Sequence, residues 1–380
     1  MKTTVKKLAA LTLMLALLLP RAGTVHAANL TVTKTADTND GVCDADCSLR
    51  EAIAAAVNGD TITVPAGTYN LSLGDLDVLV SVAINGSGAG STIINQTQPG
   101  QRVFEPAAAD VNISRVTIQG GQAGTSSTVP GHLHGGGLHN HGTVTLTNVT
   151  FTGNAAPNVD PANPTSGKGG AIWNAGIMTL INVTIADNSA AVSGAGIGGG
   201  APTLTNTIVA NNSSDNCSVA ITAGSNNLQF PGTTCGGAIP TADPLLGPLT
   251  GGVYPLLAGS PAIDTGTNTG CPPTDELGTA RPVDGDATPG AVCDIGAFEF
   301  VPTVTYASLC ALTQQFVTPN PNLGQSLCVK LSAAEAAAAR GNLNAKRAAL
   351  KAFRQEVRAQ TGKALTAGEA AILIQLSQQL

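Results

Sequence analysis

The sequence predicts an all-β fold, a right-handed parallel β-helix with an N-terminal capping helix, followed by a small α-helical module. The main observation is a repeat. Residues 135–154, GGGLHNHGTVTLTNVTFTGN, are followed by a second copy at 169–188 and a shorter third copy at 194–212. Each copy alternates apolar and polar residues in short runs between Gly and Asn, the pattern of strands and turns. Self-similarity at such a period is typical of stacked units that pair with their neighbours.

The repeat also predicts which side chains face the core. Side chains alternate across a strand, so Val144 and Leu146 should point inward. The chain should bend at Asn148, after which Phe151 should point inward and Thr150 outward. An aromatic content of 3 % and 45 glycines among 380 residues suit such a turn-rich solenoid.

Residues 1–27 have the features of a secretory signal peptide. Lysines precede a Leu- and Ala-rich run at 8–19, and small residues end the segment at Ala27. The run is too short to anchor the chain in a membrane, and no later segment reaches the roughly 18 apolar residues that a transmembrane helix needs. The sequence therefore predicts a secreted or cell-surface protein with no transmembrane segment in the mature chain.

Charge divides the chain into two parts. Residues 28–305 carry 6 basic and 21 acidic residues, a net charge of −15, whereas residues 306–380 carry 8 basic and 3 acidic residues, a net charge of +5. The acidic part argues against nucleic acid and other anionic polymers as its targets, because like charges repel. It is compatible with bound cations.

The eight cysteines fall into four pairs that are local in sequence, and an even number in an exported chain indicates disulfides. Zinc is disfavoured because the spacings are irregular and no CxxC motif occurs. Local pairing is one of 105 possible connectivities. The local pairs are Cys43 with Cys47, Cys217 with Cys235, Cys271 with Cys293, and Cys310 with Cys328.

The predicted order begins with a cap. Ser48 followed by Glu51 forms a capping box, and Leu49 and Ile53 recur at helical spacing. Such a helix would cover the open end of the solenoid. The expected boundaries are signal peptide 1–27, β-helix 28–300 (cap 29–58, rungs 59–212, C-terminal closure 213–300), linker 301–305 and helical module 306–380. Within the closure, residues 245–300 are expected to form the last rungs.

The helical module shows a sharp change in composition. Its Ala-, Lys- and Arg-rich segments predict three or four helices. Cys310 and Cys328 would tie the first two helices together. Its positive charge makes it a candidate contact with the cell envelope or a partner.

Two terminal signatures resemble one known group of proteins. CSLREAIAAA at 47–56 is similar to the opening segment of exported bacterial β-helix proteins of the CSLREA type. SPAIDTG at 260–266, RPVDG at 281–285 and CDIGAFEF at 293–300 resemble the closing "choice-of-anchor Q" signature of the same group. The resemblance implies a β-helix fold and export, and it implies no agreed activity.

Two further points qualify this resemblance. DELGTARP at 275–282 stands where the group usually has an Asp-Gln-Arg-Gly run, so the local pairing of that arginine is open. The helical module resembles the small module named FIMAH that ends many exported bacterial proteins.

Candidate ligand-binding residues lie where the rungs differ. Insertions at 122–134 and 155–168 would project from one face of the solenoid, where loops carry function more often than rungs do. The candidate contacts are Trp173, His139, His132 and His134. An outward Trp beside His could stack on a sugar ring. Together with His141 the histidines could instead hold Zn, Ni or Cu.

A second candidate site is the acidic loop before the cap helix. Oxygen-rich loops favour Ca²⁺, which makes calcium a candidate cofactor at this loop. The alternative is a set of Asx turns and solvated carboxylates. The loop residues are Asp37, Asn39, Asp40, Asp44 and Asp46.

Enzymatic activity on polysaccharides is the competing hypothesis, since a glycosidase needs a pair of carboxylates. In residues 113–215 the acids are Asp160, Asp187 and Asp215, and no two are expected on neighbouring rungs. Near the closing signature, Asp264, Asp284, Asp294 and Glu299 with Arg281 are expected to form buried or capping ion pairs. No catalytic residue is assigned.

Three functions are therefore expected in order of preference. The first is a non-enzymatic binding or adhesion scaffold for a polysaccharide or cell-envelope component. The second is a polysaccharide lyase or glycoside hydrolase. The third is a structural envelope protein. Asn148 and Asn182 resemble glycosylation sequons, but repeated turns favour stacked amides that bond from rung to rung.

Overall fold

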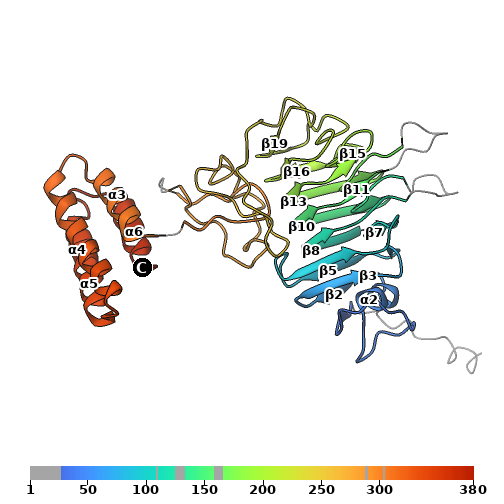
Figure 1. The fold of residues 1–380 in the computed structure, drawn as a ribbon, viewed down its shortest axis with the longest axis horizontal. Coiled ribbons are helices and arrows are strands. Elements are labelled where there is room, and N and C mark those ends of the chain that lie inside the picture. The colour runs from blue at the N-terminus through green and yellow to red at the C-terminus, as the bar shows by residue number, and fades with distance from the viewer. Residues whose placement is uncertain (1–26, 108–109, 125–132, 158–165, 287–289, 303) are drawn as a thin grey trace, which may run out of the picture.

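The computed structural model describes residues 27–107, 110–124, 133–157, 166–286, 290–302 and 304–380. Its strands pair in parallel in three sheets (Figure 1). The largest has twelve strands: β1 (Asn29–Thr31), β2 (Asp60–Val64), β3 (Gly67–Leu71), β5 (Val82–Gly86), β6 (Thr92–Gln96), β8 (Asp110–Gln119), β10 (Thr143–Thr152), β13 (Ile177–Ala186), β16 (Thr203–Thr205), β17 (Ile208–Ala210), β18 (Gly224–Ser225) and β19 (Leu228–Phe230).

The two smaller sheets alternate with the large one along the chain. The five-stranded sheet contains β4 (Leu76–Val78), β7 (Phe104–Pro106), β9 (Leu138–Asn140), β12 (Ile172–Asn174) and β15 (Ile197–Gly199), and the two-stranded sheet contains β11 (Ala155–Ala156) and β14 (Ser189–Ala190). Two successive repeats, β9 to β11 and β12 to β14, each visit the five-stranded, the twelve-stranded and the two-stranded sheet in that order, and β15 then returns to the five-stranded sheet one step along. This pairing is consistent with a parallel β-helix.

The predicted register of the repeat is confirmed. Leu146 of β10 pairs with Leu180 of β13 and with Ile113 of β8, and Leu180 pairs with Leu204 of β16. These leucines are fully buried in the core that runs through the stack. Stacked rungs thus bury the apolar side that one rung alone would expose.

The predicted bend at Asn148 is also confirmed. Asn148, Asn182 and Asn206 have φ angles of 53°, 51° and 48°. Asn tolerates this left-handed region better than most residues, which explains its recurrence at the bend. Phe151 points inward as expected. The expected exposure of Thr150 is wrong: it is buried because Glu276 covers it and accepts its hydroxyl hydrogen bond at 2.7 Å.

The asparagine ladder expected at the bend is present in one step, from Asn206 Nδ2 to Asn182 Oδ1 at 3.3 Å, and a longer ladder lies one turn later. Asn148 donates to the carbonyl of Thr274 rather than to a neighbouring rung. Instead, buried amides stack along the axis from Nδ2 to Oδ1 at 3.0 Å per step. The members of this ladder are Asn154, Asn188, Asn212 and Asn216.

The predicted cap helix is present as α2 (Leu49–Ala55), beside β2 at the N-terminal end of the stack (Figure 1). Its capping box joins Ser48 and Glu51, and Leu49 and Ile53 are buried. Glu51 also accepts hydrogen bonds from Thr38 and from the backbone of Asp40. These bonds, that from the Ser48 backbone first, lower the pKa of Glu51 to about 2.

Residues 245–300 form no further rungs, which corrects that expectation. The structure assigns no strand to the described residues between 231 and 302. The segment, which we call the strap, instead crosses the bends and outer faces of earlier rungs. It contacts Thr117 through Gly252, Thr184 through Ala297, and Asn206 through Thr267.

All four predicted disulfides are present, with Cα–Cα distances of 4.5 to 6.4 Å. They suit the oxidising compartment that an exported protein would occupy. Among the described residues, no helix is long and apolar enough to span a membrane.

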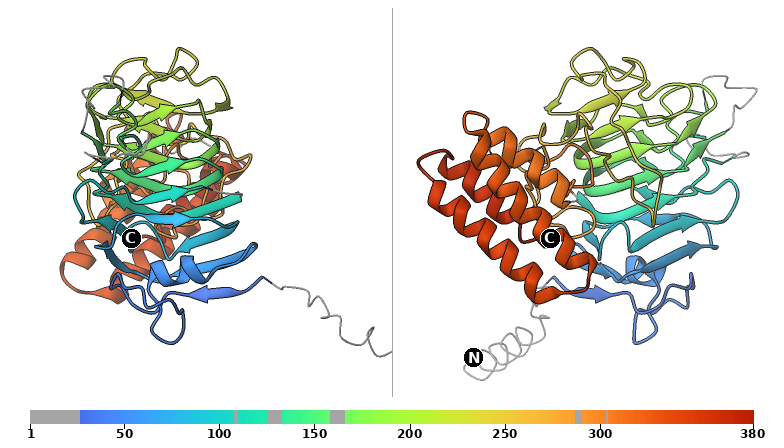
Figure 2. Two further views of the ribbon diagram at one scale, coloured as in Figure 1. Left: turned by 90° about the vertical axis from the view of Figure 1, so that its right-hand side faces the viewer. Right: turned by 60° about the vertical axis from the view of Figure 1, so that its left-hand side comes forward.

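The chain ends in four helices: α3 (Tyr306–Phe316), α4 (Pro321–Ala339), α5 (Leu343–Gln360) and α6 (Ala367–Leu376). They pack around a hydrophobic cluster of their own that includes Leu327, Leu331 and Phe353. Figure 2 shows the four helices as a bundle beside the strap. The helix content expected for this region is therefore confirmed.

Candidate functional site

The five-stranded sheet carries a row of polar and aromatic side chains on its outer face. In β4, β7, β9 and β12 the central residue points away from the core while its neighbours point inward, as strand geometry requires. The pairing register places these residues on adjacent strands, and Gly198 of β15 continues the row. We call this row the outer stripe: Asp77, Glu105, His139, Trp173 and Gly198.

Arg102 supports the outer stripe from beneath. Its side chain is 2 % exposed, and its Nη1 donates to Glu105 Oε2 at 2.7 Å and lies 2.9 Å from His139 Nδ1. Burial lowers the pKa of Arg102, and the Glu105 charge opposes that change. A guanidinium in a protein stays protonated and can only donate. His139 Nδ1 must therefore accept, which places the ring proton of the neutral imidazole on Nε2.

His141 completes the polar group at the surface. Its Nε2 lies 3.4 Å from Glu105 Oε1, and its ring centroid is 4.1 Å from that of His139. The side chain is 42 % exposed, against 19 % for Glu105. His141 and Glu105 can therefore reach a ligand, whereas Arg102 and His139 hold Glu105 and the stripe in place.

Two carboxylates meet here on neighbouring strands. Asp77 and Glu105, with Asp75, have carboxylate oxygens within 4.8 Å of one another. The pKa of Asp77 is raised, first by burial and then by the charges of Asp75 and Glu105. The expectation that no acids align on neighbouring rungs considered only residues 113–215, and this pair lies before that window.

The donor set of Glu105, His139 and His141 does not fit a metal centre well. Their ligand atoms lie within 4.8 Å of one another, as a transition metal would require. Arg102, however, already donates to Glu105 and occupies His139 Nδ1. A metal cation would lie beside this buried positive charge, which electrostatic repulsion opposes. The group is better described as a hydrogen-bonded polar cluster.

Trp173 stacks on His134 rather than on His139. The two ring centroids are 4.0 Å apart with 13° between the planes. Gly198 leaves room for the indole, because a Cβ there would approach Trp173 Cε3 to 2.9 Å. Burial, as the largest cause, lowers the pKa of His134. His132 lies outside the described residues.

The four acids of the acidic loop have other partners in this structure. Asp37 pairs with Arg50 at 2.8 Å and accepts from the backbone of Ser72 and Leu73. Asp40 and Asp44 accept from the backbone two residues on, as in Asx turns. Asp46 pairs with Lys34 at 3.0 Å. Among the described residues these acids, with Asn39 beside them, are not gathered into a cluster of three carboxylates, and calcium there stays a prediction.

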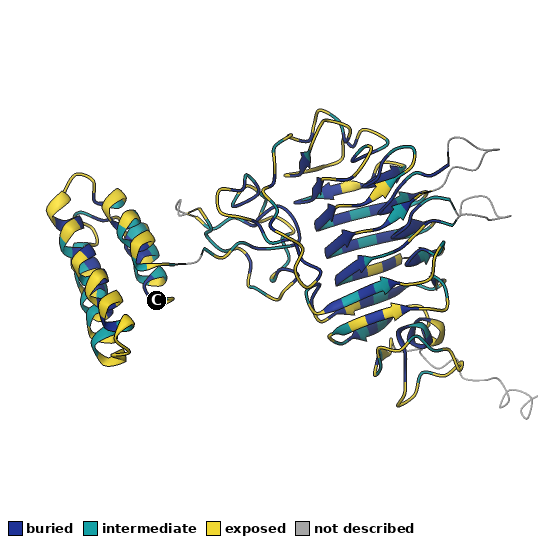
Figure 3. Ribbon diagram, in the orientation of Figure 1, coloured by how far each residue is buried: buried dark blue, intermediate teal, exposed yellow. Residues whose placement is uncertain are grey.

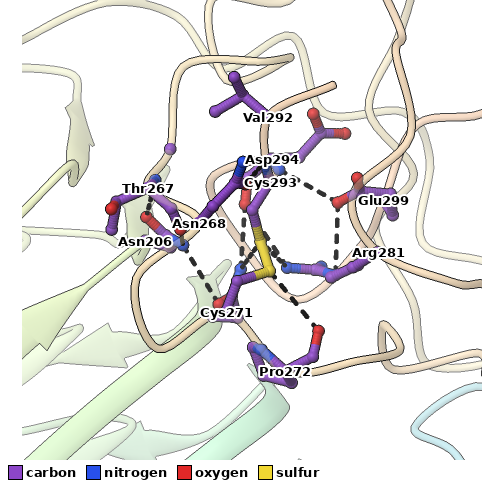
Figure 4. Close-up of a disulfide and its surroundings, with 12 residues drawn as sticks. Asn206, Thr267, Asn268, Cys271, Pro272, Arg281, Val292, Cys293, Asp294 and Glu299 are labelled. Carbon is purple, nitrogen blue, oxygen red and sulfur yellow. Dashed lines mark hydrogen bonds and ion pairs between the residues drawn. A yellow bond between two sulfur atoms is a disulfide. The ribbon is translucent and has the colours of Figure 1, made fainter. Parts of the chain in front are cut away.

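The strap contains a buried charged cluster around one disulfide (Figure 4). Arg281 Nε lies 3.3 Å from Glu299 Oε2, and both side chains are fully buried. Arg281 also donates to the carbonyl of Gly296 at 3.0 Å. Asp294 accepts from the backbone of Asp264 and Phe300. These contacts agree with the ion pairs expected near the closing signature.

Asp264 lies near two other acids, Asp284 and Asp286, with oxygens within 4.8 Å. Its Oδ2 accepts from the backbone amides of Gly285 and Asp286 at 2.7 and 2.8 Å. Asp264 therefore links two parts of the strap to each other, and we do not take this group as the candidate site.

Comparisons with known proteins add little. No family model matches the chain, and no curated protein matches it. One solved structure, described as the crystal structure of pectate lyase Pel9A, aligns with a TM-score of 0.26 and 13% identity, covering 73% of this chain and 98% of that one. At that TM-score the alignment assigns neither fold nor activity, and the fold rests on the strand pairing described above.

The sequence pointed to Trp173 and the histidines but missed Asp77, Arg102 and Glu105. The signal was present in short segments, Leu-Asp-Val at 76–78 and Phe-Glu-Pro at 104–106, where one acid lies between inward-facing residues. These strands precede the clear copies of the repeat, so their register could not be aligned from sequence.

Proposed function

We propose that the chain is an exported polysaccharide-binding protein and that the accessible members of the outer stripe, Asp77, Glu105 and Trp173, contact the glycan together with Asp75 and His141. The observation that supports this most is the register that aligns Asp77, Glu105, His139 and Trp173 on four consecutive strands. A row of side chains on regularly spaced strands suits an extended, repeating ligand.

The chemistry of the row also suits a sugar. Carboxylates accept hydrogen bonds from hydroxyl groups, and His141 can donate or accept. The indole edge of Trp173 adds an apolar surface beside these polar groups. The negative charge of Asp75, Asp77 and Glu105 favours a neutral glycan over an acidic one at this face.

A glycan array probed with the chain from Ala28 onward, with and without Ca²⁺, tests this proposal. For the glycan that the wild-type chain binds on the array, Asp77→Asn and His141→Ala should each reduce the affinity by about tenfold or less. This is the loss expected from one or two surface hydrogen bonds. Asp110→Asn is the matched control, since it removes an exposed acid from β8 on a different sheet. Equal loss in Asp77→Asn and Asp110→Asn would place the ligand elsewhere.

A second candidate function, cleavage of the glycan, is favoured by the close carboxylates. Asp77 and Glu105 bring carboxylate oxygens within 4.8 Å of one another, and glycosidases use a pair of carboxyl groups that flank the bond to be broken. Asp77, with its raised pKa, would protonate the leaving oxygen as the glycosidic bond breaks. Glu105 would form the ester to the anomeric carbon, which water then hydrolyses.

Release of reducing sugars from a panel of plant and bacterial polysaccharides separates the two functions. Cleavage would be lost altogether in Asp77→Asn, whereas glycan binding would fall by only about tenfold or less. If no substrate in the panel yields product, binding alone stands. Because Glu105 neutralises the buried Arg102, Asp77→Asn is a safer test than substitution of Glu105.

The remaining expectations belong to the same proposal. We infer that the three sheets close into a right-handed helix, that the signal peptide directs export, and that the protein acts outside the cell or on its surface. The disulfides support export. A crystal structure would test the handedness, and mass spectrometry of the exported chain would test cleavage after Ala27.

A further inference from the structure

Helix α5 presents four cations on one face. Arg347, Lys351, Arg354 and Arg358 follow one another at three- to four-residue spacing, which on a helix confines them to an arc of about 60°. Arg347, Lys351 and Arg358 are exposed. Figure 3 shows exposed and buried stretches alternating along the helices of the module. We call these four residues the basic face.

The basic face is not neutralised within the described chain. In the β-sheet body, Arg50, Arg102 and Arg281 each pair with a carboxylate. In the helical module, the one ion pair among the described residues joins Lys330 of α4 to Glu356, on a different side of α5. Arg354 donates only to Ser377 at the end of α6.

This arrangement opposes the stability of the helix. Arg347 with Lys351, and Arg354 with Arg358, are like charges four residues apart, and such pairs destabilise a helix. The side of α5 that carries Leu350, Phe353 and Val357 is buried and already fixes its packing. Arg347, Lys351 and Arg358 make no ion pair within the described residues, and an external anion would relieve their repulsion.

A surface hollow adjoins the basic face. It has a volume of about 340 Å³ and lies between the start of α5 and the residues after α6. Lys346, Arg347 and Arg354 line it together with Ser377 and Gln378. Cations beside hydroxyl and amide groups are the donors that carboxylate or sulfate oxygens accept from.

We propose that the basic face and this hollow bind an anionic polysaccharide, and that the helical module thereby tethers the protein to a surface or matrix. The cations are about 5 Å apart along the axis, one per turn. This spacing is wider than the roughly 1.7 Å per charge of duplex DNA and suits a polymer of lower charge density.

Two other anionic partners fit less well. A nucleic acid carries its charges more densely than a polysaccharide, so the net charge of −15 on residues 28–305 repels it more strongly. An interfacial membrane helix inserts an apolar face into the lipid, but that face of α5 is buried in the module. The site is separate from the outer stripe, so either proposal can fail without the other.

Binding of the whole chain from Ala28 onward to immobilised polygalacturonate tests this proposal. The triple variant Arg347→Gln, Lys351→Gln, Arg358→Gln should lower affinity about tenfold, as expected for three exposed charge contacts, and added salt should weaken the wild type similarly. Circular dichroism should show unchanged helix content, because all three side chains are exposed.

A charge-matched control separates the basic face from net charge. Ser332→Glu, Ala336→Glu, Ala339→Glu on the exposed side of α4 changes the module by the same three charges and should retain most of the binding. Equal loss in both variants would overturn the proposal, as would wild-type binding to neutral dextran at the same strength. Stronger binding to phosphatidylglycerol vesicles or duplex DNA than to polygalacturonate would also overturn it.

Discussion

Glu276 is fully buried where the strap crosses β10, and its carboxyl group has one hydrogen bond, from Thr150. Its other oxygen, Oε1, is buried with no partner among the described residues. Burial raises the pKa of Glu276 to about 8 and, in the same strap, raises that of Asp294 to about 7. A neutral, protonated carboxyl group suits such a place better than a charged one.

This carboxyl group makes stability depend on pH. Below about pH 4.5 the folded and unfolded states both hold the proton, so its contribution is complete. As pH rises from 4.5 to 8, the unfolded state releases the proton first, and the free energy of unfolding falls by on the order of 2–4 kcal/mol. Glu276→Gln should flatten this decline, which urea unfolding at pH 5 and pH 8 would measure.

Glu335 supplies the control for that measurement. It is an exposed carboxyl on α4, so Glu335→Gln should leave the decline between pH 5 and pH 8 unchanged. The slope with pH is the readout, because a buried glutamine amide can lower stability at every pH. A Glu276→Gln protein that loses stability between pH 5 and 8 as steeply as the wild type would contradict the assignment.

Among the elements, the strands and the cap helix were more predictable from sequence than the contacts between side chains of different strands. The repeat fixed the inward positions of β10 and β13 because alternation is a local property. The capping box of α2 was equally local. The site was only half predictable, because Arg102 reaches Glu105 and His139 across strands whose register the sequence did not reveal.

The disulfide between Cys310 and Cys328 links α3 to α4 across 18 residues. A loop of that size contributes roughly 3 kcal/mol by restricting the unfolded chain. Cys310→Ala, Cys328→Ala should therefore lower the melting temperature of the helical module, followed by circular dichroism at a helix-sensitive wavelength. Trp173, the single Trp of the chain, lies in the β-sheet body, so its fluorescence transition should not move.

Unchanged melting of the helices in this double variant would contradict a stabilising role for the disulfide. A matching fall in the Trp173 transition would show instead that module and body unfold together. The separate hydrophobic clusters of the two parts favour independent transitions.

At the scale of the whole molecule, the strap couples rungs of the solenoid that are not neighbours. In a simple repeat stack each rung contacts only its neighbours. Here the backbone carbonyl of Glu276 accepts a hydrogen bond from the backbone N–H of Ala89, and the carbonyl of Thr267 accepts one from the side-chain amide of Asn206. One segment thus joins rungs far apart in the stack. These contacts follow no repeating sequence pattern and so could not be predicted, which is why further rungs were expected at 245–300.

Asn182 tests this coupling. Its Nδ2 donates to the carbonyls of Asp294 and Gly296 in the strap, and its φ of 51° is one that Gly also adopts readily. Asn182→Gly therefore removes the strap contacts, together with the hydrogen bond that Asn182 Oδ1 accepts from Asn206, without straining the bend. We expect a loss of roughly 1–3 kcal/mol in the free energy of unfolding and faster hydrogen exchange at 291–300.

Asn211→Gly is the matched control for this prediction, because Asn211 has a φ of 56°, is exposed and makes no side-chain contact with the described strap. It should cost only a few tenths of a kcal/mol through the greater freedom of glycine in the unfolded chain. Hydrogen exchange in the strap should match that of the wild type. If both variants accelerate exchange equally, the strap is held by its own disulfide and ion pairs, and the rungs unfold as an ordinary nearest-neighbour stack.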